Sequence, residues 1–125
     1  MSPRVLSVVF LAVMGAAVAF FWAAAANRRH PRLHVRLALI GAAIDIVGTL
    51  AVFVTGRWLG WEIPPADAGL ALVHRGFAYA ATALLVVQAT TGFLRLRAHP
   101  ALGVLFLLVV TATYGLAIFA YRLGG

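Results

Sequence analysis

Four long apolar stretches constrain this chain more than any other feature, and they cover residues 5–26, 37–56, 68–94 and 101–121. Each stretch is long enough to cross a bilayer, which requires about 20 residues at a rise of about 1.5 Å per residue. Hydrophobic residues make up 64% of the sequence, so a water-soluble bundle of these helices would have no polar faces to present to water. The sequence therefore predicts an integral membrane protein.

The predicted fold is all-α, a four-transmembrane-helix bundle of up-down-up-down topology, with helices at about residues 5–26, 34–56, 68–95 and 101–122. Connections this short force neighbouring helices to be antiparallel. The helices and loops use up all 125 residues, so we expect a single integral membrane domain, residues 1–125. The first helix is expected to stay in the mature protein, because its apolar span is about twice that of a usual signal peptide.

The arginines predict how the bundle is oriented. The first loop carries four of them and the third loop two, whereas the second loop carries one together with Glu62 and Asp67. The positive-inside rule places the first and third loops in the cytoplasm, which gives an N-out/C-out topology. In the second loop, Trp58 and Trp61 suit the membrane–water interface, and Asp67 is expected to cap the third helix.

Composition excludes several classes of function. The chain has no cysteine, which excludes disulfides, thiolate zinc sites, iron–sulfur clusters and covalently attached c-type haem. Its net charge of +7 comes from arginines near helix ends, so nucleic acid is not a predicted partner. The sequence holds no nucleophile beside a base, no paired carboxylates and no phosphate-binding loop, so no enzyme activity is predicted.

Asp45 is the carboxylate expected near the middle of the membrane. It shares one face of the second helix with Gly41 and Gly48. An intramembrane carboxylate is costly and indicates a functional site, where it would hold a proton, a cation or a ligand. The alternative is a protonated, structural carboxyl group bonded to Tyr114, Tyr79 or a threonine. The sequence leaves both interpretations open.

The third helix carries His74 and Gln88 on one face, together with small residues at three- and four-residue steps. That spacing indicates that both side chains face the bundle interior. His74 lies near the predicted outer surface. It is interpreted either as a ligand or redox residue, or as a structural histidine paired with Glu62 or Asp67.

Three histidines lie on the cytoplasmic side: His30, His34 and His99. His34 and His99 are predicted at comparable depth, so they could be the two axial ligands of a haem b whose propionates bind arginines. His30 and His34 could also share a metal, but Pro31 disfavours a continuous helix between them. His74 lies about 30 Å away along the third helix, so one haem or none is predicted. Alternatively, these histidines have no ligand and are simply favoured, as arginines are, at the level of the lipid headgroups.

Short motifs in a fixed order carry a resemblance: HPRLHVR from residue 30, LVHRGF from residue 72, RLRAHPALG from residue 95, and a last helix ending in TATYGLAIFAY. In this order they resemble the small YozB-type multi-helix membrane proteins implicated in maturing haem–copper respiratory oxidases. The resemblance covers about residues 27–122. It implies that His34 (or His30), His74 and His99 correspond to the family's histidines, and that Tyr114 and Tyr121 match its last helix.

The chain departs from that family in two respects. It is shorter than the usual members, and it has two histidines where one would suffice, so either His30 or His34 could be the counterpart. The pattern also resembles, more weakly, the di-histidine b-type membrane cytochromes, in which facing histidines lie at matched depth.

Four hypotheses for the function follow. The first is an accessory or assembly protein of a haem–copper type respiratory complex whose histidines bind haem or metal. The second is a b-type electron-transfer subunit, and the third a cofactor-free structural subunit of a larger respiratory complex. A proton-linked transporter using Asp45 and His74 is disfavoured, because four helices leave little room for alternating access. The expected location is a bacterial-type inner membrane, with lipid and a larger membrane complex as partners. The oligomeric state is left open.

Overall fold

A computed structural model of the chain describes residues 1–124 and contains four long helices. They are α1 (Pro3–Ala26), α2 (Pro31–Leu59), α3 (Ala68–Phe93) and α4 (His99–Tyr121). All four are long and apolar enough to cross a membrane. The predicted all-α architecture of four transmembrane helices is therefore confirmed, and the chain is a multi-pass membrane protein.

The helix ends follow local capping chemistry. The Ser2 side chain accepts a hydrogen bond from the Val5 backbone N–H at 3.3 Å, which begins α1. Asp67 Oδ1 accepts one from the Leu70 N–H at 2.9 Å, so the predicted cap of the third helix is confirmed. α2 ends at Leu59, and the C-cap residue Gly60 has a left-handed φ of 65°, a conformation that glycine adopts without a steric penalty.

Six boundaries differ from the predicted ones by one to three residues. α1 begins at Pro3 rather than at residue 5, α2 ends at Leu59 rather than at residue 56, and α4 ends at Tyr121 rather than at residue 122. The other three have clear local causes. α2 begins at Pro31 rather than at residue 34, because proline has a helical φ and its missing N–H is not needed in the first turn. α3 ends at Phe93 rather than at residue 95, because Arg95 adopts a left-handed φ of 53° that a helix cannot continue through. α4 begins at His99 rather than at residue 101, with Pro100 in its first turn.

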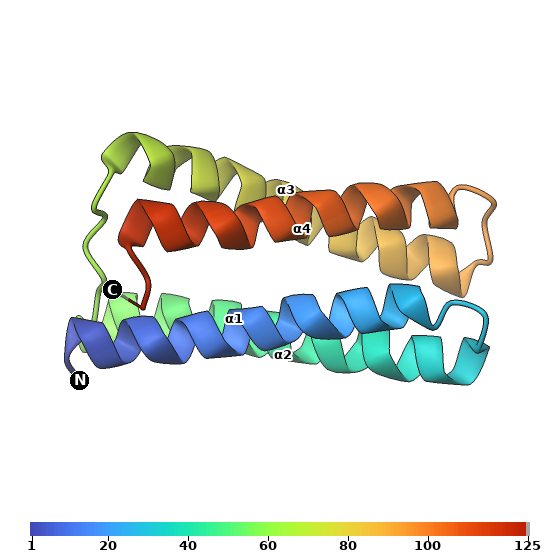
Figure 1. Ribbon diagram of the computed structural model, residues 1–125, viewed down its shortest axis with the longest axis horizontal. Helices are drawn as coiled ribbons and strands as arrows, with labels where there is room; N and C mark the ends of the chain where they lie inside the picture. The colour runs from blue at the N-terminus through green and yellow to red at the C-terminus, as the bar shows by residue number, and fades with distance from the viewer. Residues whose placement is uncertain (125) are drawn as a thin grey trace.

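The helices form two antiparallel hairpins, α1 with α2 and α3 with α4 (Figure 1). The hairpins meet through α1 and α4, which leaves α2 and α3 in the outer positions. Both chain termini and the α2–α3 connection lie at one end, and the other two connections lie at the opposite end (Figure 1). We call this opposite end, residues 27–36 and 95–100, the arginine-rich end. It is the cytoplasmic end in the predicted orientation.

Polar contacts join the two hairpins across the α1–α4 interface. The Trp22 indole N–H donates to Thr111 Oγ1 at 3.0 Å. The Tyr114 hydroxyl donates to the Leu11 carbonyl oxygen at 3.1 Å. Gly15 permits this approach, because a Cβ there would lie 2.7 Å from the Tyr114 hydroxyl oxygen. These bonds fix the rotation of α4 against α1 inside the membrane.

The packed core is small and lies between the hairpins. Phe21 of α1 and Phe106 of α4 stack edge to face, with ring centroids 4.8 Å apart, and both are buried. Around them the core consists of small and branched residues: Ala17, Ala81 and Val110. Large apolar side chains instead cover the outward faces of α2 and α3, among them Leu39, Phe53, Leu72 and Val86. In a membrane these faces contact lipid or other helices. Their exposure carries no free-energy penalty there, because lipid tails are as apolar as the side chains.

Candidate functional site

The structure brings His34 and His99 together at the arginine-rich end. Their ring centroids lie 6.3 Å apart and the ring planes are nearly perpendicular, at 88°. They meet because each histidine lies at the beginning of a helix that starts at this end, His34 in α2 and His99 in α4. His30 does not join them. It is exposed at the N-cap of α2, where Pro31 begins the helix.

Backbone carbonyls orient both imidazoles. His34 Nδ1 lies 2.7 Å from the Ala24 carbonyl oxygen of α1, and His99 Nδ1 lies 3.1 Å from the Gln88 carbonyl oxygen of α3. A carbonyl oxygen only accepts, so each Nδ1 carries the hydrogen and donates it. In the neutral ring the lone pair is then on Nε2. Metal-ligating histidines show the same arrangement, with one ring N–H donated to a carbonyl or carboxylate and the other nitrogen on the metal.

Gln88 and Thr91 of α3 complete the polar surroundings of His99. Thr91 Oγ1 lies 3.2 Å from His99 Nδ1, and Gln88 Nε2 lies 3.4 Å from His99 Nε2. The other amide atom, Gln88 Oε1, is buried without a hydrogen-bond partner. We call His34, Gln88, Thr91 and His99 the histidine cluster. The predicted inward orientation of Gln88 agrees with its place here.

Two glycines make room for the histidine cluster. A Cβ at Gly92 of α3 would lie 2.7 Å from His99 Cε1, and a Cβ at Gly103 of α4 would lie 2.6 Å from Gln88 Nε2. The sequence did not assign either glycine to this cluster. The spacing of four residues from His99 to Gly103 places both on one face of α4, which was the available signal. The contact between Thr91 and His99 could not be predicted from the sequence, where Thr91 is distinguished only by its position next to Gly92.

Two imidazoles are enough protein ligands for a haem iron, but they are fewer than a structural metal ion takes. Among residues 1–124, no group of three or more histidines and carboxylates lies close enough to hold a metal. A structural zinc ion takes about four protein ligands, whereas haem iron already has four macrocycle nitrogens and needs only axial ligands. In the structure the two rings pack edge to face, and His99 Nε2 lies 3.4 Å from the Gln88 amide nitrogen, which would have to move for His99 to bind a metal.

His74 lies at the opposite end of the bundle and contacts α4. Its Nδ1 lies 2.9 Å from the Thr113 carbonyl oxygen, and its ring centroid lies 5.9 Å from that of Tyr121. Among the described residues, the hydrogen bond of His74 goes to Thr113 of α4, and Asp67, one of the two carboxylates considered as its partner, caps α3. His74 therefore joins α3 to α4 and is no part of the histidine cluster.

Asp45 is half-buried on the face of α2 that packs against α1. Tyr114, one of the alternative partners considered for Asp45, donates its hydroxyl hydrogen to the Leu11 carbonyl oxygen instead. Tyr79, another predicted partner, is 71% exposed on α3. Asp45 lies about 16 Å from His34 along α2, so it is separate from the histidine cluster.

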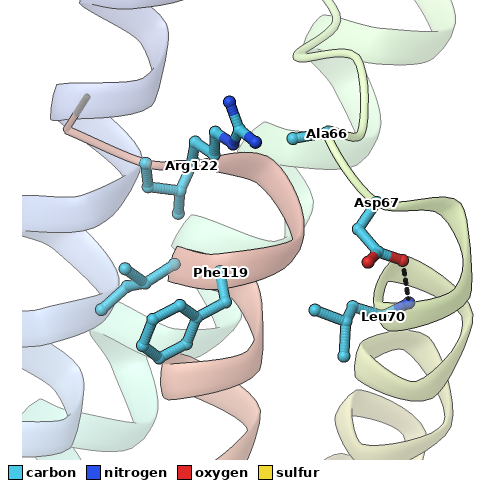
Figure 2. A pocket seen from close by; sticks show the side chains of 7 residues that line it. Ala66, Asp67, Leu70, Phe119 and Arg122 are labelled. Carbon is cyan, nitrogen blue, oxygen red and sulfur yellow. Dashed lines mark hydrogen bonds between the residues drawn. The ribbon is translucent and has the colours of Figure 1, made fainter.

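A surface hollow of about 460 Å³ lies at the termini end, between the start of α3 and the end of α4 (Figure 2). Asp67, Leu70, Phe119 and Arg122 lie around it. The dashed line in Figure 2 shows that the Asp67 carboxylate is already engaged with the Leu70 N–H. We therefore interpret this hollow as part of the packing between the start of α3 and the end of α4, and not as a binding site.

No known protein family, curated protein or solved structure matches the chain. The assignment of a function therefore depends on the geometry of the histidine cluster and on the short motifs of the sequence.

Proposed function

We propose that this chain is an accessory or assembly protein of a haem–copper type respiratory complex in a bacterial-type plasma membrane, and that His34 and His99 hold one haem b. The observation that carries the proposal is the meeting of these two imidazoles, each with its Nδ1 hydrogen donated to a carbonyl oxygen. The order of the histidine motifs, which resembles the YozB-type proteins, supports the respiratory assignment.

Haem at this site would supply a one-electron redox centre. His34 and His99 would hold it, and the carbonyl oxygens of Ala24 and Gln88 accept the Nδ1 hydrogens of the two rings, which leaves the lone pair of each neutral ring on Nε2. Propionate groups need cationic partners, and arginine pairs with carboxylates through two parallel hydrogen bonds. The arginines of the two adjacent loops would supply them: Arg28, Arg29, Arg95 and Arg97.

An accessory role fits the chain better than a complete electron-transfer path. The histidine cluster is at one end of the bundle, and His74 at the other end donates to Thr113 rather than facing a second histidine. One redox centre at one membrane surface does not carry electrons across the bilayer. It does suit a protein that holds haem, or passes it to a partner within the membrane.

Deletion of the gene in its host tests the proposal. We expect the oxidase polypeptides to remain at normal levels while the cofactor content and the oxidase activity fall. The wild-type gene and His74→Ala should restore activity, whereas His34→Ala and His99→Ala should not. An oxidase of normal spectrum and activity in the deletion strain would contradict the assembly role. Full restoration by both His34→Ala and His99→Ala would contradict the role of the histidine cluster.

A cofactor-free structural subunit is the second candidate, and a specific observation favours it. His34, His74 and His99 each donate to a carbonyl of the neighbouring helix, which is a sufficient structural reason for their presence. The broad apolar faces of α2 and α3 could pack against helices of a larger complex. This candidate predicts that the chain co-purifies with that complex without haem, and that the association survives replacement of the three histidines.

A further inference from the structure

A second feature of the arginine-rich end lies on the outside of α2. A shallow hollow of about 380 Å³ is lined by Pro31, Arg32, Val35 and Arg36. Arg32 and Arg36 are four residues apart, so they are neighbours on one face of the helix, about 5–6 Å apart at Cβ. All four residues are exposed. The hollow thus presents two guanidinium groups beside an apolar surface.

This face points away from the histidine cluster. Arg32 and Arg36 each lie two residues from His34, which is about 200° around an α-helix. His34 itself faces α1, because its ring donates to the Ala24 carbonyl oxygen. The arginine pair therefore lies on the outward side of α2, where a membrane-spanning helix meets lipid.

No acidic side chain of the sequence belongs to the arginine-rich end. The arginine-rich end carries six arginines, and all three acidic residues of the chain lie outside it: Asp45, Glu62 and Asp67. Deeper in the membrane, the same face of α2 continues as exposed apolar side chains. Val35 is 51% exposed, Leu39 63% and Ile46 53%. A ligand that fits both parts has an anionic head and an apolar tail.

We propose that Arg32 and Arg36 bind the phosphate of an anionic phospholipid whose acyl chain lies along Val35 and Leu39. Guanidinium groups pair with phosphate oxygens through parallel hydrogen bonds, and basic pockets at the cytoplasmic side of membrane helices recognise anionic headgroups. The lipid would hold the start of α2 at the headgroup level. This inference goes beyond the proposed function and does not depend on it.

Native mass spectrometry of the delipidated, full-length protein in detergent tests the site. The protein is titrated with phosphatidylglycerol or with phosphatidylcholine, and the dissociation constant of the first bound lipid is measured. An arginine near an anionic lipid contributes about fivefold in affinity, so Arg32→Gln with Arg36→Gln should weaken phosphatidylglycerol binding about 25-fold. The matched double variant Arg95→Gln with Arg97→Gln removes the same charge from the same end and should weaken it less than about threefold.

Three results would overturn the proposal. They are equal losses in the two double variants, equal affinity of the wild-type protein for the two lipids, and displacement of the lipid by an equal concentration of glycerol phosphate. The last result would mean that the arginines bind free phosphate instead. Circular dichroism checks that the variants remain helical. Arg32→Lys with Arg36→Lys keeps the charge without the planar fork, and we expect it to retain most of the preference for phosphatidylglycerol.

Discussion

Replacement of Gly92 by alanine should destabilise the bundle, because the new methyl group would lie 2.7 Å from His99 Cε1 and 3.1 Å from Nδ1. The imidazole cannot simply rotate away, since its Nδ1 is held by the Gln88 carbonyl and the Thr91 hydroxyl. Overpacking of this kind lowers the free energy of unfolding by about 1–3 kcal/mol, whereas alanine in place of glycine in a helix raises it by about 0.5–1 kcal/mol. We therefore expect a net loss of about 0.5–2 kcal/mol in the free energy of unfolding.

Gly76→Ala provides the matched control in the same helix. A Cβ at Gly76 would have no atom within 4 Å, so this substitution should be neutral or stabilising by up to about 1 kcal/mol. Reversible unfolding in mixed micelles, followed by far-ultraviolet circular dichroism, measures both variants against the wild-type protein. If Gly92→Ala proved as stable as Gly76→Ala, the close packing of His99 against α3 would be refuted.

Three further predictions follow from the geometry. Gly103→Ala should cost less than Gly92→Ala in the same unfolding assay, because its methyl group would meet only the terminal amide of Gln88, which can move. Tyr114→Phe removes the bond to the Leu11 carbonyl between the hairpins and should cost about 0.6 kcal/mol, whereas a neutral result would deny that bond a role in stability. The chain has no cysteine, so Ala66→Cys and Ala98→Cys can be labelled singly in intact cells. An impermeant maleimide should label only Ala66→Cys if the predicted orientation is correct.

The four helices could be predicted because length and apolarity alone determine them. The meeting of His34 and His99 could be anticipated as well, since both begin helices at the same end of an up-down-up-down bundle. The ends of the helices were harder to predict, because they depend on single residues. Pro31 extends α2 by three residues, and the left-handed Arg95 shortens α3.

The detailed partners could not be predicted, because hydropathy does not specify which helices are neighbours. The pairing of α1 with α4 between the hairpins decides that Tyr114 donates to Leu11 and not to Asp45. The register of α3 against α4 decides that His74 donates to Thr113, across a separation of 39 residues. Both depend on the whole fold rather than on local sequence.

A reduced-minus-oxidised absorption spectrum of the protein purified in mild detergent, with haem quantified on the same sample, tests the central claim most directly. We expect a Soret band and a sharp alpha band at about one haem per chain, lost in His34→Ala and in His99→Ala and kept in His74→Ala. A featureless spectrum from the wild-type protein, or haem that persists when both His34 and His99 are replaced, would contradict the assignment of this pair as a haem site.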